Sequence, residues 1–102
     1  MEDCVFCKIV KGEIPSSKVF EDDDFVVFKD IKPSAPTHLL IVTKKHVSDI
    51  SEADEDILIK IRNIALKLQK ELRLEEFQLK INWGKLLDIN HLHAHFLAGI
   101  EE

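Results

Sequence analysis

The chain has 102 residues, of which 45% are hydrophobic and 32% are charged, and this balance is typical of one soluble globular domain over residues 1–102. Its 14 basic and 19 acidic residues give a net charge of −5, which argues against a nucleic-acid-binding surface with clustered basic residues. No run of 18 apolar residues exists, and the acidic start Met1–Cys4 lacks the apolar run of a secretory signal. We therefore expect a cytoplasmic protein that does not span a membrane.

The first motif is the C-x-x-C formed by Cys4 and Cys7, in a short predicted helical turn that ends at Gly12. In the cytoplasm such cysteines are more commonly metal ligands or reduced thiols than a structural disulfide. A redox-active C-x-x-C is usually preceded by a β-strand, whereas here the motif opens the chain. A zinc site needs two further ligands from elsewhere in the chain. The pair alone therefore leaves a metal site and two reduced thiols open.

Three β-strands are expected in the first half of the chain. The segments Val19–Glu21 and Phe25–Phe28 flank three aspartates, which fit a solvated turn because they lack the spaced ligands of a calcium loop. The run His38–Lys44 has the strongest β-pattern. Pro33 and Pro36 precede it, and neither could lie inside a central strand, so residues 30–37 are expected to form a loop.

A helical period replaces the β-pattern from Ser51 to Leu72. Ser51 or Asp54 can cap this helix. One apolar stripe, with intervals of three and four residues, is expected to pack on the sheet: Ile57, Ile61, Ile64, Leu68 and Leu72. Ile59 and Leu66 lie off this stripe, and they fit either an isolated exposed pair or the interface of a homodimer.

Two more strands, Phe77–Ile81 and His91–Leu97, complete a predicted α+β fold with a mostly antiparallel five-stranded sheet, one long helix and a short N-terminal helix. Strand alternation divides the second segment into an apolar face, Leu92, Ala94 and Phe96, and an imidazole face, His91, His93 and His95. Neighbouring imidazoles would lie about 7 Å apart, so the outer two could act on a group attached to the middle one. Histidine can serve as nucleophile, acid, base or metal ligand near pH 7, and strict alternation therefore favours a functional site over a half-exposed strand.

These features resemble the histidine triad family, in particular its branch of small nucleotide-binding phosphoramidases. The family pattern His-φ-His-φ-His-φ-φ, where φ is apolar, is satisfied at every position of residues 91–97. The likeness extends over nearly the whole chain: Phe6, Lys8-Ile9, Gly12–Pro15, Phe20–Asp23, Phe28, Asp30-Ile31, Pro33, Ala35–His38 and Lys44–Val47. It implies a histidine-triad-like fold and a homodimer in which the long helix and the strand Phe77–Ile81 join two sheets edge to edge.

The resemblance also implies an enzyme that cleaves purine nucleoside 5′-phosphoramidates. His93 would attack the α-phosphorus and form a covalent nucleotidyl-imidazole, which water then hydrolyses. His91 and His95 are the outer histidines of this catalytic triad, and His95 would hold the phosphate oxygens together with Asn82.

The family pattern assigns the remaining site residues. Asp30 would accept hydrogen bonds from the ribose hydroxyls, and His38 would brace the triad by hydrogen bonding. The base would lie among four apolar side chains: Phe6, Ile9, Phe28 and Ile31. A structural zinc ion would be held by two thiolates and two imidazoles, which make a closed tetrahedral site: Cys4, Cys7, His46 and His91.

One loop departs from the family pattern. The family carries Gly-Gln-Ser before the triad, in a loop about two residues longer, and here Leu86, Leu87 and Asp88 occupy those positions. Leucine offers no hydrogen bond, and an aspartate repels an anionic phosphate. Two functions therefore remain open: a phosphoramidase, and a zinc-stabilised nucleotide-binding domain with little turnover. A third, weaker alternative makes the three triad histidines ligands of a catalytic metal.

Overall fold

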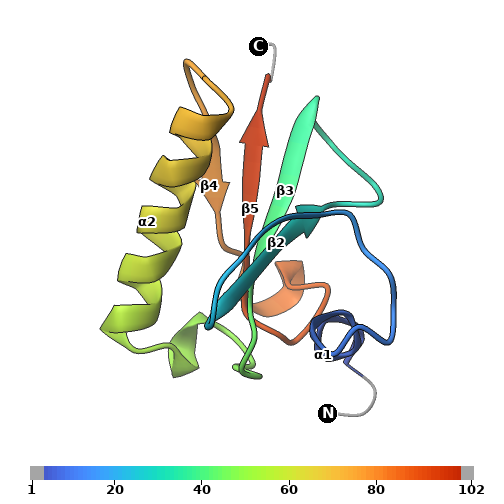
Figure 1. The fold of residues 1–102 in the computed structure, drawn as a ribbon. Helices are drawn as coiled ribbons and strands as arrows, with labels where there is room; N and C mark the ends of the chain where they lie inside the picture. Colours follow the sequence, from blue (N-terminus) through green and yellow to red (C-terminus); the bar gives the residue numbers. More distant parts are fainter. Residues whose placement is uncertain (1–3, 100–102) are drawn as a thin grey trace.

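The computed structural model describes residues 4–99, and Figure 1 shows the elements that they form. In chain order these are α1 (Val5–Val10), β1 (Lys18–Glu21), β2 (Phe25–Lys29), β3 (Thr37–Thr43), a short 3₁₀ helix (Ile50–Glu52), α2 (Glu55–Glu71), β4 (Gln78–Lys80), a second 3₁₀ helix (Gly84–Leu86) and β5 (His93–Ala98). The first three residues, on which the expectation about a secretory signal rests, lie outside this range.

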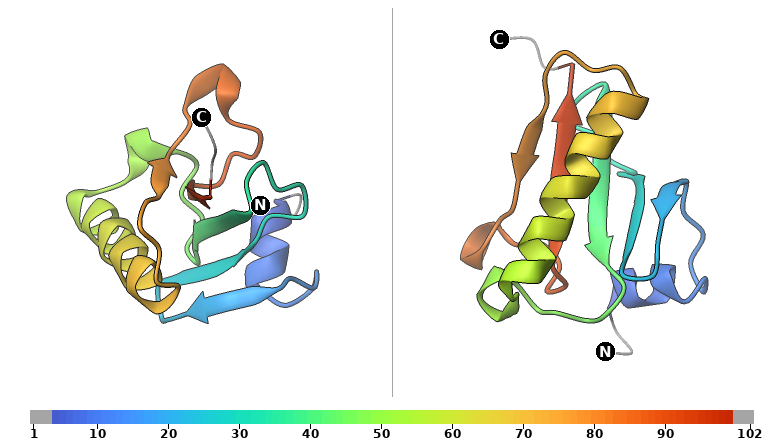
Figure 2. Two further views of the ribbon diagram at one scale, coloured as in Figure 1. Left: turned by 90° about the horizontal axis from the view of Figure 1, so that it is seen from above. Right: turned by 60° about the vertical axis from the view of Figure 1, so that its left-hand side comes forward.

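The five strands form one sheet in the order β1-β2-β3-β5-β4, and every neighbouring pair is antiparallel. The predicted α+β fold is therefore confirmed, whereas the dimer stays a prediction. The view from above in Figure 2 shows α2 against one face of the sheet and α1 on the opposite side. The sheet consequently has an apolar core on both faces.

Strand alternation separates these two cores. Residues from β2, β3, β5 and α2 form the larger one: Phe25, Val27, Leu39, Ile41, Val47, Ile61, Ile64, Ala65, Leu68, Leu92, Ala94 and Phe96. The smaller core joins α1 to the other face: Phe6, Ile9, Val26, Phe28, Leu40 and Val42. All four residues of Phe25–Phe28 are buried, which explains why this strand is apolar at every position. The apolar residues of the triad segment face α2, as predicted, and this leaves the histidines on the α1 side.

The long helix is shorter than the sequence predicts at its N-terminal end. Asp54 caps α2, and its side chain accepts a hydrogen bond from the Ile57 backbone N–H at 2.9 Å. Ala53 is extended and separates α2 from the 3₁₀ helix before it, so no continuous helix starts at Ser51. The placement of Leu72 on the buried stripe is wrong: it caps the C-terminus and is 42% exposed, because the chain leaves the helix at this point.

The short helix α1 positions the C-x-x-C motif. The Cys4 side chain caps it by accepting a hydrogen bond from the Cys7 backbone N–H. Gly12 follows the helix with a φ of 81°, a conformation that favours glycine, and there the chain turns toward β1. Six helical residues are too few for a stable isolated helix, so α1 depends on Phe6 and Ile9, which it buries against the sheet.

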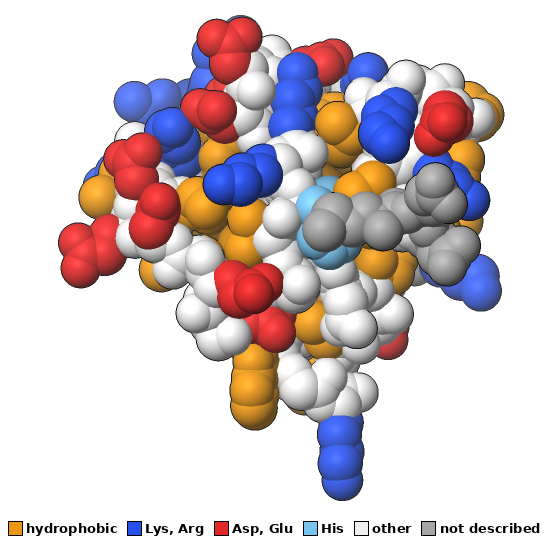
Figure 3. Space-filling model, turned by 90° about the horizontal axis from the view of Figure 1, so that it is seen from below, with side chains coloured by type: hydrophobic (Ala, Val, Ile, Leu, Met, Phe, Trp, Pro, Cys, Tyr) orange, Lys and Arg blue, Asp and Glu red, His pale blue; other side chains and the backbone are white. Residues whose placement is uncertain are grey.

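No helix within residues 4–99 combines the length and the apolar character that a membrane crossing requires. Figure 3 views the molecule from below, and acidic and basic side chains are interspersed over this face, where histidine also reaches the surface.

Candidate functional site

A cavity of about 880 Å³ lies on the α1 side of the sheet. Its lining includes all seven residues that the sequence proposed for nucleotide binding, namely Phe6, Ile9, Phe28, Asp30, Ile31, Asn82 and His95, and also His38 and His93. These residues come from α1, the end of β2, the following loop, β3, the segment after β4, and β5. The fold therefore brings residues that are up to 89 positions apart, from Phe6 to His95, to one concave site.

His93 is held with one ring nitrogen free. The ring is buried, and its Nδ1–H donates to the backbone carbonyl of His91 at 2.8 Å. In a neutral imidazole the other nitrogen, Nε2, then carries the lone pair. Phe6 packs edge-on against the His93 ring, with the ring centroids 4.9 Å apart, and this contact further fixes the ring. The arrangement leaves His93 with a single available nucleophilic atom.

A chain of hydrogen bonds fixes the other two imidazoles of the cavity. The Ser34 backbone N–H can only donate, so Nδ1 of His38, at 3.0 Å, is its acceptor. The proton of His38 is then on Nε2, which lies 2.9 Å from Nδ1 of His95 and 3.3 Å from a carboxylate oxygen of Asp30. Nδ1 of His95 accepts, and its Nε2–H remains to donate to a ligand.

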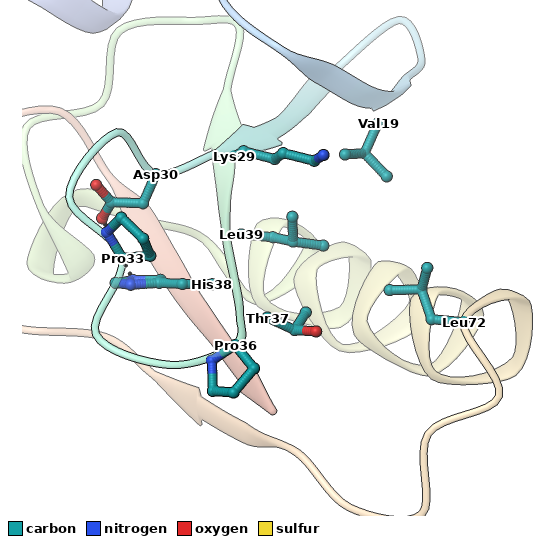
Figure 4. Close-up of a pocket in the computed structure, with 9 residues that line it drawn as sticks. All are labelled: Val19, Lys29, Asp30, Pro33, Pro36, Thr37, His38, Leu39 and Leu72. Carbon is teal, nitrogen blue, oxygen red and sulfur yellow. Dashed lines mark ion pairs between the residues drawn. The ribbon is translucent and has the colours of Figure 1, made fainter. Parts of the chain in front are cut away.

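Figure 4 shows Asp30 and His38 side by side at one end of a smaller cavity of about 410 Å³. That cavity borders the pair from the α2 side, where Leu39 and Leu72 also line it. The other carboxylate oxygen of Asp30 accepts from the Lys32 backbone N–H at 2.9 Å. The carboxylate is thus anchored in its loop and braces His38.

Burial favours the neutral forms of His93 and His95. It lowers the pKa of His93, although the hydrogen bond to His91 and the nearby carboxylate of Asp88 act in the opposite direction. It also lowers the pKa of His95 to about 4, and the neighbouring His93, His38 and Lys80 add to this effect. At neutral pH both rings are therefore uncharged, which a nucleophile and a fixed hydrogen-bond donor require.

Of the four apolar side chains that the sequence assigned to the base, three are buried and one is exposed. Phe6, Ile9 and Phe28 are buried and form a firm wall, whereas Ile31 is 93% exposed on the loop after β2. Ile31 borders the cavity, so a ligand bound there would cover part of its side chain. Such an exposed apolar side chain at the mouth of a concave site is typical of a residue that contacts a ligand.

In the loop that departs from the family pattern, Leu86 and Asp88 differ in whether they reach the cavity. Leu86 is 71% exposed and does not line the cavity, whereas Asp88 does line it. Leu87 is half-buried just after the second 3₁₀ helix. A carboxylate therefore stands at the cavity wall near His93.

Two thiols and two imidazoles form a second cluster at the end of the sheet beside α1. The sulfur of Cys4 lies 3.2 Å from Nδ1 of His91, and the sulfur of Cys7 lies 3.2 Å from Nδ1 of His46 and 3.5 Å from Nδ1 of His91. The four atoms lie within 4.8 Å of one another, and the two cysteines are free thiols. The sequence prediction that these residues meet is confirmed.

This donor set fits a tetrahedral metal ion such as Zn²⁺. With Zn–S bonds of about 2.3 Å and Zn–N bonds of about 2.0 Å, tetrahedral geometry sets sulfur and nitrogen about 3.5 Å apart, close to the distances here. Nε2–H of His91 donates to the Thr43 carbonyl at 2.6 Å, which turns the Nδ1 lone pair toward the sulfurs. Burial lowers the pKa of His91 and so favours the neutral, ligating form. Burial also raises the pKa of the Cys7 thiol, so a metal ion would have to displace its proton.

The three triad histidines do not converge on one metal site. His91 belongs to the thiol cluster, His95 lies with Asp30 and His38 in another group, and His93 is in neither of the groups found within residues 4–99. Nε2 of His38 carries a proton because Nδ1 accepts from Ser34, so this nitrogen is not free to bind a metal. The geometry thus disfavours the alternative of a catalytic metal on the triad.

Sequence reasoning missed three residues near these clusters. The shortest contacts of Ser34 and Thr43 with the imidazoles come from backbone groups, which leave no signal in the residue type, and their hydroxyls lie somewhat farther away, at 3.4 and 3.2 Å. Lys80 lines the cavity and is directly opposite His95 in the pairing of β4 with β5. The alternation of Phe77–Ile81 could have placed Lys80 on the face opposite its apolar neighbours, but only the strand register brings it to His95.

Comparisons with known proteins identify what the whole chain is similar to. The family model described as "Scavenger mRNA decapping enzyme C-term binding" matches residues 3–101. "Adenosine 5'-monophosphoramidase HNT1" of Saccharomyces cerevisiae is 35% identical over 101 residues, which are 97% of this chain and 64% of that protein. The chain thus spans less than two thirds of that relative. "Protein HitA" of Neisseria gonorrhoeae is 36% identical over 104 residues, and the match covers 96% of this chain and 97% of HitA.

Two solved structures match this chain over almost their full length. A histidine triad protein from Clostridium difficile has a TM-score of 0.93 at 39% identity, and the match covers 100% of this chain and 95% of that one. A HIT family hydrolase from Clostridium thermocellum has a TM-score of 0.92 at 39% identity, with 99% and 94% of the two chains covered.

Proposed function

Because the chain belongs to the histidine triad family, we propose that it hydrolyses purine nucleoside 5′-phosphoramidates at the α-phosphorus, through a covalent nucleotidyl intermediate on His93. The observation that supports this proposal most strongly is the orientation of the His93 ring. Its Nδ1–H is committed to the His91 carbonyl, and Nε2 is the free atom at the cavity wall. A neutral imidazole that is fixed in this way can attack without a separate base.

The reaction has two displacements at phosphorus. In the first, Nε2 of His93 forms a bond to the α-phosphorus, the phosphorus–nitrogen bond to the leaving group breaks, and the amine departs with an added proton. In the second, water attacks the same phosphorus and the bond to His93 breaks. The departing amine takes its proton from solvent in the first step, the attacking water returns a proton to solvent in the second, and that water supplies the oxygen of the nucleoside monophosphate. Dividing one hard displacement into two is the advantage of the covalent route.

The other cavity residues have distinct roles in this proposal. Nε2–H of His95 donates to a phosphate oxygen, and the relay from Ser34 through His38 keeps the proton on that nitrogen. Asn82 supplies a second neutral donor to the phosphate. The other site side chains serve the nucleoside: Asp30 for the ribose, and Phe6, Ile9, Phe28 and Ile31 for the base.

We also propose that the thiol cluster holds a structural zinc ion, bound by Cys4, Cys7, His46 and His91. A site with four protein ligands has no open position, so the ion would supply stability and no chemistry on the substrate. It would tie α1 to the ends of β3 and β5. Because the His91 carbonyl accepts the hydrogen bond from His93, fixing His91 also supports the orientation of the nucleophile.

The proposal is tested by incubating wild type and His93→Ala with adenosine 5′-phosphoramidate and following adenosine monophosphate (AMP) by chromatography. Wild type should release AMP, and the variant should lose this activity while it binds AMP almost as tightly in calorimetry. Lys85→Met is the control, since it changes an exposed side chain that does not line the cavity. Equal background release by wild type and His93→Ala would show that the protein is not this enzyme.

A nucleotide-binding domain with little turnover is the second candidate. It is favoured by one observation, the carboxylate of Asp88 at the cavity wall where the family has a neutral serine. Tight AMP binding by wild type without AMP release from the phosphoramidate would select this candidate.

A further inference from the structure

One charged residue of the cavity is not used by the proposed mechanism. Lys80 is the last residue of β4, at the edge of the sheet, and it lines the same cavity as His93, His95 and Asn82. Within residues 4–99 the ion pairs that involve lysine are those of Lys18, Lys44, Lys60 and Lys67. The Lys80 ammonium therefore lies at the cavity without a carboxylate partner among the described residues.

The strand register fixes where Lys80 acts. Lys80 and His95 are directly opposite each other in the antiparallel pair of β4 and β5, so their side chains leave the sheet on the same face. Their Cβ atoms are then about 5 Å apart, within easy reach of a lysine side chain. His38 approaches His95 from the β3 side, and Lys80 approaches it from the β4 side. A phosphate oxygen that accepts from His95 would thus have Lys80 next to it.

The charged side chains that line the cavity indicate a role for Lys80. The carboxylates of Asp30 and Asp88 both line the cavity and repel an anionic phosphate. The other lysines of the lining, Lys29 and Lys32, belong to the end of β2 and the loop after it, at the Asp30 end of the cavity. Lys80 is the lysine on the β4–β5 side of this lining, where the triad lies.

We propose that the Lys80 ammonium contacts the α-phosphate of the nucleotide and compensates for the neutral donors that Leu87 and Asp88 cannot supply. This inference rests on the proposed function, because it needs a nucleotide in the cavity. Since the charge acts on the phosphate before and during the reaction, it contributes to binding of substrate and transition state alike. The site would then bind nucleotides in a strongly salt-dependent way.

The test compares Lys80→Met, which keeps the apolar stem and removes the charge, with Lys80→Arg and with the control Lys85→Met. Lys85 is an exposed lysine in the neighbouring 3₁₀ helix and does not line the cavity. Calorimetry measures AMP and adenosine binding at low and high salt. We expect Lys80→Met to weaken AMP binding about tenfold, in the range of a solvent-exposed charge-assisted hydrogen bond, and to leave adenosine binding unchanged. Lys80→Arg should restore most of the affinity, and Lys85→Met should match wild type.

Kinetics give a second readout. Lys80→Met should raise KM for adenosine 5′-phosphoramidate about tenfold with kcat nearly unchanged, which is the signature of lost uniform binding. Wild-type AMP affinity in Lys80→Met, or an equal loss of adenosine and AMP binding, would overturn the role of Lys80 alone. Failure of wild type to bind AMP would overturn the proposed function, and this inference with it.

Discussion

Removal of the metal ion should destabilise the wild-type protein. It should have little effect on a variant that lacks one of the four metal-binding side chains. The thiol cluster joins α1 to the ends of two central strands, since Cys7 is in the helix, His46 follows β3 and His91 precedes β5. The perturbation is therefore treatment with a strong chelator, applied in parallel to wild type and to Cys7→Ser.

The magnitude follows from linkage. A metal ion that is free at 100 times its dissociation constant stabilises the folded state by about 2.7 kcal/mol, provided that the unfolded chain does not bind it. For a domain of roughly 100 residues, each kcal/mol corresponds to about 4 °C or more in Tm. Chelation should thus lower the Tm of wild type by about 10 °C. The burial of His91 and Cys7 adds to the effect, because without the ion the Cys7 sulfur and Nδ1 of His91 have only weak thiol–imidazole contacts.

The assay is differential scanning calorimetry of zinc-loaded and chelated samples, with hydrogen exchange as a local readout. Protection should decrease first in residues 5–10, because α1 is too short to remain helical on its own. Cys7→Ser should melt lower than wild type and respond little to chelator. The reasoning is refuted if chelation leaves the wild-type Tm unchanged, or if it lowers the Tm of wild type and Cys7→Ser equally.

Three further outcomes are expected. The double substitution Leu87→Gln and Asp88→Ser should raise the turnover of adenosine 5′-phosphoramidate, because one preorganised donor is worth about a hundredfold to a thousandfold in rate, and an unchanged kcat would contradict this. Sedimentation at micromolar concentration should find a dimer, because β4 is an edge strand and Ile59 is 54% exposed on the adjacent helix; a species of only 11.8 kDa would end the idea. The pKa of His95 is about 4 in the folded protein, against about 6.5 in an unfolded chain. The unfolded state therefore takes up this proton first, and the free energy of unfolding should decrease as the pH falls from 6.5 to 4. Urea melts should show a smaller decrease in His95→Gln than in wild type.

Local patterns predicted most of the fold because burial repeats with the period of the element. The continuous apolar run Phe25–Phe28 fits either a strand with two buried faces or a hairpin under a helix, and the structure has the former, while the alternation around His93 places the histidines opposite the apolar core. The start of α2 was less certain because Ser51 and Asp54 can both cap a helix. Only the extended backbone of Ala53 selects Asp54, and that conformation depends on the tertiary structure.

The site was predicted as a set of residues, but its hydrogen bonds were not. The family pattern brought Cys4 and His91 together, although 87 positions separate them. The proton positions on the imidazoles depend on the backbone groups of Ser34 and Thr43, whose residue types carry no signal for this role. Lys80 reaches the cavity through strand register, which is a long-range property that a single sequence does not specify.

The role of His93 as the nucleophile is tested most directly by measuring the intact mass of the protein during turnover. Wild type is mixed with adenosine 5′-phosphoramidate, quenched within milliseconds to seconds, and analysed by mass spectrometry with fragmentation. We expect one adenylyl group per chain, attached to His93, that disappears as the substrate is consumed and is absent from His93→Ala. Turnover without any adduct at the earliest times, or an adduct on a residue other than His93, would contradict the mechanism.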